Sequence, residues 1–314
     1  MLQKTPFSCP AKDGLVLRGM LWSDPEVKPK AAVLYIHGML EHYQRYDDYA
    51  SFMGRQGVLF FIFDLRGHGT TTPDEENRGF FGEKDGVSNL MSDIDCVRGK
   101  MSSMLAERGL QDLPIFIYGH SMGSFITSCY VRRTQAKGFR GIILSGTNAR
   151  LGVAGLAGRL ARMQCILKGP KSKAILISRM AFGKYNDKCV PRRTPNDWLS
   201  HDDAVVDAYN ADPGCTFIFK AAGFADLLSM LVEIGADNWT GAVPAEVPIY
   251  IFSGDADPVG QYGKGPKILY QWYKDTGHDV QLKLYPEGRH EMHNERNRQE
   301  VYEDVLSFIS GHSS

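Results

Sequence analysis

The sequence predicts an α/β protein with a mostly parallel central sheet that is flanked by helices and interrupted by an inserted helical cap. Short apolar runs rich in β-branched and aromatic residues alternate with helical stretches along most of the chain, a rhythm typical of parallel sheets. The rhythm stops over 148–237, where helical pieces occur without a clear buried strand. The 314 residues are enough for one large domain or two small ones.

The predicted elements begin with 15–22, whose alternation is typical of one arm of an antiparallel hairpin. Buried strands are predicted over 31–36, 58–63, 114–118, 141–144, 248–252 and 280–285. Helices are predicted over 43–56, 87–108 and 295–309, the last with Val301, Val305, Phe308 and Ile309 on one face. We therefore expect a core made of residues 1–147 and 238–314, and a cap made of residues 148–237.

Charge and composition exclude several classes of protein. The chain has 36 basic and 36 acidic residues, and this balance argues against general nucleic-acid binding. Residues 1–12 lack the basic flank and apolar core of a secretory signal, and no uncharged apolar run reaches transmembrane length. We expect a cytoplasmic protein whose six scattered cysteines are reduced and structural, with no metal site and no cofactor.

Residues 119–123 read G-H-S-M-G and directly follow the predicted strand 114–118. After Ser121 the apolar residues recur at helical spacing, so strand, turn and helix come in the order that a nucleophile elbow requires. Such a turn lifts the serine hydroxyl clear of the backbone, where a neighbouring base can reach it, and the glycines relieve the crowding. Ser121 is therefore the candidate nucleophile.

An acid and then a histidine should follow the nucleophile along the chain. Asp257 lies just beyond the predicted strand 248–252, and His290 lies just beyond the predicted strand 280–285. Loops at adjacent strand ends can bring such residues within hydrogen-bond reach. We therefore expect His290 to act as the base and Asp257 to orient it.

Two other residues compete for these roles. Asp255 is better suited to shaping the turn after the strand. His293 belongs to the approach to the last helix, whereas Gly288 allows the tight turn that a projecting imidazole at position 290 would use. His278 and His201 lie on polar stretches, where we expect exposed histidines without a role in the site.

The negative oxygen that forms during acyl transfer should be held by two backbone N–H groups. Met122, directly after the nucleophile, supplies the first donor. Met39, just after the predicted strand 31–36, supplies the second, and Gly38 lets the backbone turn close to the substrate.

Three sequence runs carry a resemblance to a known family. Residues 37–46 fit H-G-x-x-E-H-x-x-R-Y, residues 64–69 fit D-x-R-G-H-G, and residues 119–123 form the elbow. Over nearly its whole length the chain resembles the monoacylglycerol lipase and lysophospholipase branch of the α/β-hydrolases, a serine aminopeptidase S33-like group. Only the cap is weakly matched.

The resemblance implies an α/β-hydrolase fold with a cap over the site, and it implies Ser121, Asp257 and His290 as nucleophile, acid and base. It favours a serine carboxylester hydrolase without metal or cofactor, acting on a small single-chain acyl ester such as a monoacylglycerol. A lysophospholipid is the alternative substrate. A catalytically silent α/β-hydrolase-like binding protein is a further alternative, although nucleophile, acid and base are all present.

The two halves of the predicted cap differ in charge. Residues 148–193 include 11 basic and 1 acidic residue, whereas residues 194–238 include 1 basic and 8 acidic residues. Either the charges are solvated or paired with each other, or the basic half makes transient contact with an anionic lipid surface. The apolar residues of the basic half favour an acyl pocket. They are Leu151, Leu156, Leu160, Ile166, Leu167, Ile175, Leu176 and Ile177.

Overall fold

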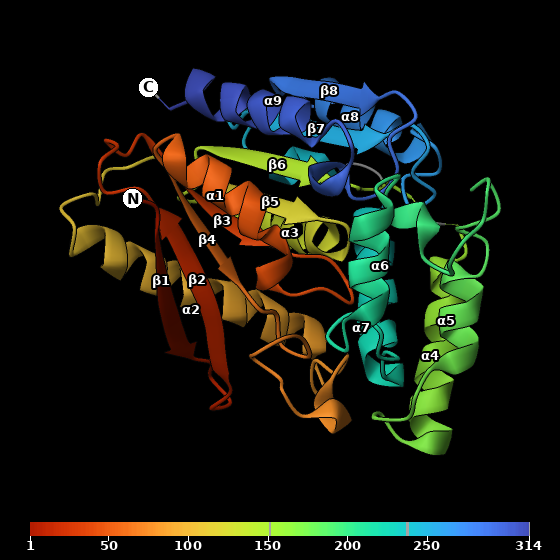
Figure 1. Ribbon diagram of the computed structural model, residues 1–314. Coiled ribbons are helices and arrows are strands. Elements are labelled where there is room, and N and C mark those ends of the chain that lie inside the picture. Colours follow the sequence, from red (N-terminus) through yellow and green to blue (C-terminus); the bar gives the residue numbers. More distant parts are fainter. Residues whose placement is uncertain (151, 237–238, 314) are drawn as a thin grey trace.

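A computed structural model describes residues 1–150, 152–236 and 239–313, and it folds the chain around one eight-stranded sheet (Figure 1). The strands are β1 (Gln3–Pro10), β2 (Val16–Ser23), β3 (Ala31–Ile36), β4 (Val58–Phe63), β5 (Ile115–His120), β6 (Gly141–Ser145), β7 (Ile249–Gly254) and β8 (Val280–Tyr285). Each of the six predicted buried strands begins and ends within two residues of an observed strand.

The strand order across the sheet is β1-β2-β4-β3-β5-β6-β7-β8. The β1–β2 and β2–β4 pairs are antiparallel, and the other pairs are parallel. The predicted hairpin arm is therefore β2, with β1 as its partner. The sequence-predicted fold class, a mostly parallel sheet flanked by helices, is confirmed.

The helices of the core cover both faces of the sheet. They are α1 (Asp47–Arg55), α2 (Gly86–Ala106), α3 (Met122–Thr134), α8 (Lys264–Asp275) and α9 (Arg298–Gly311). Buried residues of α2, α3 and α8 share one apolar cluster, and buried residues of α1 and α9 share another. The predicted helix 43–56 is a short 3-10 helix followed by α1.

Side chains of the strands alternate between these two clusters. On β3, Ala32 and Leu34 belong to the cluster of α2 and α3, whereas Val33 and Tyr35 belong to the cluster of α1 and α9. Because both faces are covered, β3 and β4 are apolar throughout and read as continuous hydrophobic runs.

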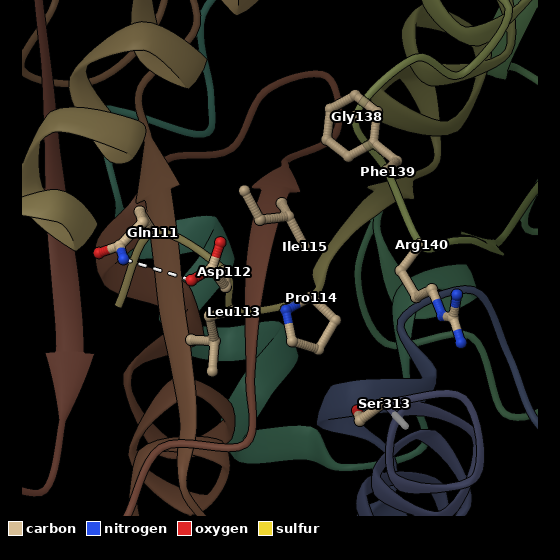
Figure 2. Close-up of a pocket in the computed structure, with 9 residues that line it drawn as sticks. All are labelled: Gln111, Asp112, Leu113, Pro114, Ile115, Gly138, Phe139, Arg140 and Ser313. Atoms are coloured by element: carbon tan, nitrogen blue, oxygen red, sulfur yellow. Dashed lines mark hydrogen bonds between the residues drawn. The ribbon is translucent and has the colours of Figure 1, made fainter. Parts of the chain in front are cut away.

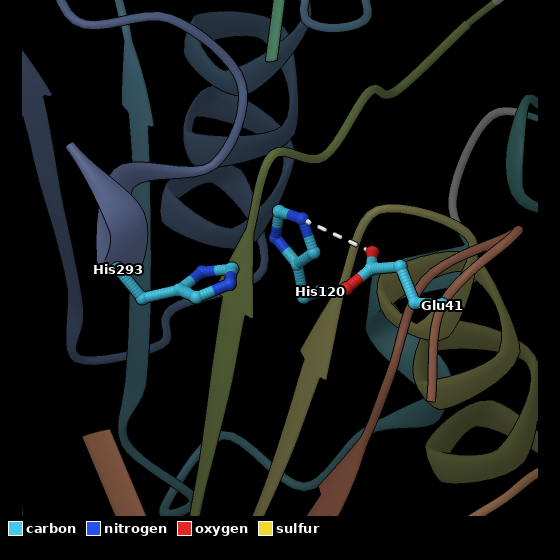
Figure 3. A group of neighbouring side chains, drawn as sticks. All are labelled: Glu41, His120 and His293. Atoms are coloured by element: carbon cyan, nitrogen blue, oxygen red, sulfur yellow. Dashed lines mark ion pairs between the residues drawn. The ribbon is translucent and has the colours of Figure 1, made fainter. Parts of the chain in front are cut away.

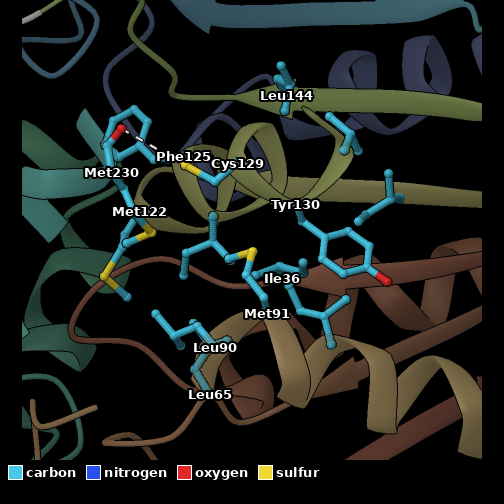
Figure 4. Packing of buried hydrophobic residues seen from close by; sticks show 14 of the residues in the cluster. Ile36, Leu65, Leu90, Met91, Met122, Phe125, Cys129, Tyr130, Leu144 and Met230 are labelled. Atoms are coloured by element: carbon cyan, nitrogen blue, oxygen red, sulfur yellow. Dashed lines mark hydrogen bonds between the residues drawn. The ribbon is translucent and has the colours of Figure 1, made fainter. Parts of the chain in front are cut away.

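In the described residues, four α-helices lie between β6 and β7 in the sequence. They are α4 (Ala154–Lys168), α5 (Ile175–Phe182), α6 (Asp203–Ala211) and α7 (Ala221–Ile234). In Figure 1, α6 and α7 lie beside the sheet and α4 and α5 lie farther out. Figure 4 shows α7 meeting the core, where Cys129 on α3 faces the Met230 carbonyl oxygen at 3.9 Å.

The division into core and cap stays a prediction. Its second boundary, at Asp237 and Asn238, lies outside the described residues, as does Leu151. Within the described ranges, none of the helices is long and apolar enough to cross a membrane.

Candidate active site

Ser121 occupies the turn between β5 and α3, with φ 52° and ψ −123°. This backbone conformation is uncommon for a residue with a side chain, and such strain is typical of functional turns. The flanking glycines are required by close packing. A Cβ on Gly119 would lie 2.3 Å from the Gly123 carbonyl oxygen, and a Cβ on Gly123 would lie 2.0 Å from the Ile36 carbonyl oxygen.

The structure brings Ser121, His290 and Asp257 into one hydrogen-bonded chain. His290 Nε2 lies 2.8 Å from Ser121 Oγ, and His290 Nδ1 lies 3.0 Å from each carboxylate oxygen of Asp257. His290 and Asp257 are both buried. In this arrangement the carboxylate orients the imidazole, and the imidazole can accept the proton of the hydroxyl.

Asp257 is held in place by two further donors. The Val259 N–H donates to its carboxylate at 2.8 Å, and the Ser253 hydroxyl donates at 3.0 Å. Asp255 is exposed, and its carboxylate instead accepts the N–H of Glu287 at 2.7 Å. Asp255 therefore holds the turn, while Asp257 faces the imidazole.

The surroundings of His290 make it a stronger base. Burial lowers the pKa of His290, but the charge and hydrogen bond of Asp257 raise it, with additional contributions from Glu291 and Glu41. The net result is a pKa above the ordinary histidine value. An imidazole with this pKa can take a proton from a hydroxyl and return it later at neutral pH.

Met39 and Met122 both line the cavity beside the serine. The Met122 N–H belongs to the first turn of α3, where no intrahelical carbonyl can accept it. The loop that carries Met39 is fixed by His37, whose Nδ1 lies 2.7 Å from the Gly38 carbonyl oxygen and whose Nε2 accepts the Leu65 N–H at 3.0 Å. The use of these two N–H groups as an oxyanion hole stays a prediction.

A buried group of charges lies next to the His290 loop. Arg45 donates to both carboxylate oxygens of Glu291, at 2.7 and 2.8 Å, and to Glu41 at 3.2 Å. Burial and the charge of Glu291 raise the pKa of Glu41 to about 7. Burial also raises the pKa of Glu291, but Arg45 outweighs this effect and lowers it to about 2. The single guanidinium of Arg45 is thus hydrogen-bonded to two buried carboxylates.

Glu41, His120 and His293 form a compact group that invites comparison with a metal site (Figure 3). Their ligand atoms lie within 4.8 Å of one another, and Glu41 Oε1 lies 3.7 Å from His120 Nε2. Burial lowers the pKa of His120, and it lowers that of His293 to about 3, so both rings are neutral. The Arg45 guanidinium already forms an ion pair with Glu41, so its positive charge would repel a divalent metal ion bound at the same carboxylate.

His42, Asp212 and Cys215 form a second group of this kind. His42 Nε2 lies 2.7 Å from Asp212 Oδ2. Burial raises the pKa of the Cys215 thiol, so it is not the thiolate that a metal would need. The hydrogen bond between His42 and Asp212 instead joins the loop after β3 to the segment after α6.

A cavity of about 1370 Å³ opens over Ser121 and His290 and is lined mainly by apolar side chains of α3, α4, α5 and α7. Two of the residues that the sequence assigns to an acyl pocket, Leu156 and Ile177, line it. That assignment is wrong for the other five described residues, which do not line the cavity: Leu160 is partly buried, and four are exposed on α4 and α5. The four exposed residues are Ile166, Leu167, Ile175 and Leu176.

The opposite charges of the two cap halves pair only locally. Among the described residues, the ion pairs between the halves are those of Arg193 with Asp203 and Asp207, at 3.1 and 3.0 Å. Lys171 and Lys173 pair instead with glutamates of the core. Arg162 of the basic half also acts on Asp226 of the acidic half, because its charge opposes the rise in the pKa of that carboxyl.

A family model for serine aminopeptidase, S33 (Hydrolase_4) matches residues 27–297 of the chain. The chain belongs to the Hydrolase_4 family. A carboxyl esterase from Bacillus coagulans, solved in complex with glycerol, is 31% identical to this Hydrolase_4 protein, with a TM-score of 0.90 and 99% of each chain covered.

Curated relatives of this Hydrolase_4 protein include two lipases. A monoacylglycerol lipase of Mycolicibacterium smegmatis is 28% identical over 297 residues, which cover 93% of this chain and 92% of the lipase. A monoglyceride lipase of Mus musculus is 27% identical over 304 residues, which cover 95% of this chain and 86% of the lipase. The relatives are thus lipases and esterases of the monoglyceride lipase-like branch, and the resemblance predicted from the sequence is confirmed.

Three groups of this Hydrolase_4 protein that adjoin His290 were not predicted from the sequence. The ring of Trp198, from the segment between α5 and α6, lies 5.1 Å from the ring of His290. Glu291 and Arg45 form the ion pair described above. Arg45 could have been noticed, because it belongs to the H-G-x-x-E-H-x-x-R-Y run, but its partner is far away in the sequence.

One expectation about the remaining histidines is wrong. His278 is buried, because its ring packs edge to face on Tyr273 of α8 at 5.0 Å, and its Nε2 lies 3.1 Å from the Val243 carbonyl oxygen. His201 is only partly exposed, and its Nδ1 lies 3.0 Å from Glu295. His293 lies in a short 3-10 helix just before α9, as the sequence predicts.

A second hollow, of about 450 Å³, lies at the amino ends of β5 and β6 (Figure 2). The hydrogen-bonded chain of serine, histidine and aspartate lies at the carboxyl ends of the strands, on the opposite edge of the sheet. Neither histidine nor cysteine lines this hollow in the part of the chain that the structure describes. The large cavity is therefore the candidate active site.

Proposed function

We propose that this Hydrolase_4 protein is a serine carboxylester hydrolase that cleaves single-chain acyl esters, with monoacylglycerols as the preferred substrates. The observation that carries the proposal is the chain Ser121 Oγ, His290 Nε2 and Nδ1, and the Asp257 carboxylate, with contacts of 2.8 and 3.0 Å at one end of a large apolar cavity. The lipase and esterase relatives support the same reaction class.

In the proposed reaction, Ser121 Oγ attacks the ester carbonyl carbon while His290 Nε2 takes the hydroxyl proton. Asp257 keeps the imidazole oriented and stabilises the imidazolium. The N–H groups of Met39 and Met122 hold the negative oxygen. His290 then gives its proton to the leaving alcohol, and an acyl-enzyme remains. Water attacks this ester with His290 as base, which releases the carboxylic acid and restores the serine.

The cavity supports a substrate with a long apolar part. Its wall between α4 and α7 is aliphatic and aromatic, which suits an acyl chain and gives a highly charged substrate few partners. In this proposal residues 148–237 act as the cap that forms the acyl site, and residues 1–147 and 238–314 carry the catalytic groups.

A lysophospholipid is the second candidate substrate, because exposed cations lie at the rim of the same cavity. Arg179, Lys184 and Arg192 line it, and within the described residues no acidic side chain forms an ion pair with them. A phosphate head group would find charge-assisted hydrogen bonds there.

The outer surface of α4 and α5 supports transient contact with a lipid surface. Exposed large hydrophobic side chains of the described chain concentrate there, including Ile166, Leu167 and Leu176. Basic residues such as Arg159 lie between them. Apolar side chains mixed with cations are the composition of helices that lie on anionic membranes.

The test is hydrolysis of a matched panel by the wild type and by Ser121→Ala. The panel contains short and long monoacylglycerols, lysophosphatidylcholine and an aminoacyl amide. Loss of the nucleophile should reduce turnover by at least about a thousandfold. Ser128→Ala, a buried serine on α3 away from the cavity, is the matched control and should keep its activity.

The outcomes separate the candidates. Preference for a monoacylglycerol, abolished in Ser121→Ala, supports the proposal and sets the acyl length. Preference for lysophosphatidylcholine makes the basic rim a head-group site. No turnover on any member of the panel contradicts the proposal and favours a silent binding protein.

A further inference from the structure

The segment between α5 and α6 touches the His290 loop through both side chain and backbone. The Trp198 and His290 rings have centroids 5.1 Å apart and planes at 39°. The His290 N–H donates to the Trp198 carbonyl oxygen at 3.3 Å, and the Glu291 N–H donates to the Leu199 carbonyl oxygen at 2.8 Å. Arg289 also reaches this segment, at 2.7 Å from the Asp197 carbonyl oxygen.

The indole itself is held in a fixed place. The backbone N–H of Trp198 donates to Asn186 Oδ1 at 2.9 Å. The Tyr185 ring packs against the indole at 4.9 Å, edge to face, and the Phe182 ring is stacked at 6.4 Å. Trp198 also lines the cavity. A partly buried aromatic ring fixed in this way is a rigid wall against the imidazole.

We propose that Trp198 is a positioning residue for His290, which holds the imidazole toward Ser121 and stabilises the imidazolium that forms when the serine proton is taken. The proposal rests on the proposed function for its effect on turnover, but its contact with His290 does not depend on any substrate. An indole face attracts a nearby cation more strongly than a phenyl face, and an aliphatic side chain has no such attraction.

Other charged and titratable groups also act on His290 from the elements packed around it. They are Asp257 after β7, Glu291 on its own loop, Glu41 after β3, His120 at the end of β5 and His293 before α9. Arg45 forms ion pairs with two of them, Glu41 and Glu291. The rings of His120 and His290 lie 4.8 Å apart. Because burial keeps His120 neutral, this ring does not oppose the imidazolium. Trp198 is the aromatic neighbour of His290 that comes from outside the core.

The replacement must keep water away from the imidazole, because hydration would itself raise the pKa of His290. Leucine at position 198 keeps an apolar cover over the imidazole but has no π face. Phenylalanine keeps both the cover and a π face, which attracts a cation more weakly than an indole does. The acid limb of the kcat/KM profile reports the protonation of His290, and Trp198→Leu should move it to lower pH by about 0.5–1 unit. The same variant should lower kcat by about two- to tenfold. Trp198→Phe should give values between those of Trp198→Leu and the wild type.

A fluorescence titration tests the contact without substrate. An imidazolium quenches a neighbouring indole more strongly than a neutral imidazole does, so wild-type emission should fall as His290 becomes protonated. This component should vanish in both Trp198→Phe and His290→Ala. Trp272→Phe, on α8 and outside the cavity, is the matched control and should retain it.

The two readouts distinguish the failure of this proposal from the failure of the proposed function. A quenching component lost in Trp198→Phe and in His290→Ala supports the contact even if no ester of the panel is hydrolysed. An emission titration that is unchanged in Trp198→Phe would overturn the proposal. An acid limb that stays in place in a folded Trp198→Leu enzyme would overturn it as well.

Discussion

The two halves of the predicted cap differ in how they contact the rest of the chain. The inner half, residues 194–236 with α6 and α7, is tied to the core by ion pairs and backbone hydrogen bonds. The outer half, residues 152–193 with α4 and α5, packs mainly on α7 and presents apolar and basic side chains to solvent (Figure 1). The inner half can therefore hold geometry, and the outer half is free to meet a surface.

The ties of the inner half surround the candidate site. Asp212 pairs with His42 at 2.7 Å, in the loop after β3. The Arg45 guanidinium lies over the Tyr209 ring of α6 at 4.8 Å. Farther along, Glu233 of α7 accepts from Arg132 of α3 at 3.0 Å. Trp198 belongs to this half, so the ring that packs against His290 lies on the half that these contacts hold in place.

The outer half has weaker links to the core. Lys171 and Lys173 form ion pairs with Glu76 and Glu75 at 3.4 and 3.7 Å, and all four side chains are exposed to solvent. Exposed pairs of this kind contribute little to stability. The segment that contacts the His290 loop and the segment that exposes apolar and basic side chains are therefore separate parts of residues 152–236.

The largest expected effect comes from removing the charge that the inner half packs against. Arg45→Met leaves Glu41 and Glu291 buried without their shared cation, which should lower the free energy of unfolding by about 3–5 kcal/mol. Urea unfolding followed by circular dichroism measures this change. Arg179→Met on the outer half is the matched control, and an equal loss in both variants would contradict the comparison.

A pH effect of similar origin concerns Glu291, whose folded pKa is lowered to about 2 from an ordinary value of 4.5. A lowered carboxyl pKa means that the unfolded chain binds more protons, so this contribution is present above pH 4.5 and is lost as pH falls toward 2. Wild-type stability should fall by about 3 kcal/mol over that window for this group alone. The slope should be shallower in Glu291→Gln, and identical slopes would refute the assignment.

A smaller effect is expected where the inner half meets the loop after β3. Asp212→Asn removes a partly buried charge from His42, so we expect a loss of about 1 kcal/mol in unfolding free energy and a reduced kcat/KM. Asp207→Asn breaks an exposed pair with Arg193 and should cost less than about 0.5 kcal/mol. Urea titration and ester hydrolysis check both variants. Equal losses of unfolding free energy in the two variants would contradict the expectation that the partly buried ion pair contributes more than the exposed one.

The smallest effect on stability is expected on the outer half. A triple variant, Ile166→Ser, Leu167→Ser and Leu176→Ser, should unfold within about 0.5 kcal/mol of the wild type, because these side chains are already exposed. The same variant should lose binding to vesicles that contain anionic lipid, measured by co-sedimentation. Val232→Ser, an exposed apolar residue of the inner half, is the control and should bind normally.

Much of this arrangement could be predicted from the sequence, because periodicity and turn chemistry are local. The runs that became β3, β4 and β8 were visible as apolar stretches, and the spacing of Gly119 and Gly123 predicted the elbow before its packing was known. Helix α8 was missed, because Pro266 lies in its first turn, a position where proline is tolerated but is easily taken for a break.

What the sequence did not predict depends on contacts between distant segments. Trp198 and Glu291 carry no local signal, because their roles arise only when the segment between α5 and α6 meets the His290 loop. The same limit explains His278, whose polar neighbours indicated exposure while α8 buries it. Of the apolar residues that the sequence assigns to the acyl pocket, Ile177 is buried, whereas Ile166, Leu167 and Leu176 are exposed, because the position of α4 and α5 relative to α7 depends on distant contacts.

Covalent labelling tests the central claim most directly. The protein is treated with a fluorophosphonate, digested, and the labelled peptide is identified by mass spectrometry. We expect one adduct on Ser121, absent in Ser121→Ala and formed more slowly in His290→Ala, because in the proposed reaction the imidazole takes the serine proton. An adduct that persists in Ser121→Ala, or the absence of any adduct on a folded wild-type protein, would contradict it.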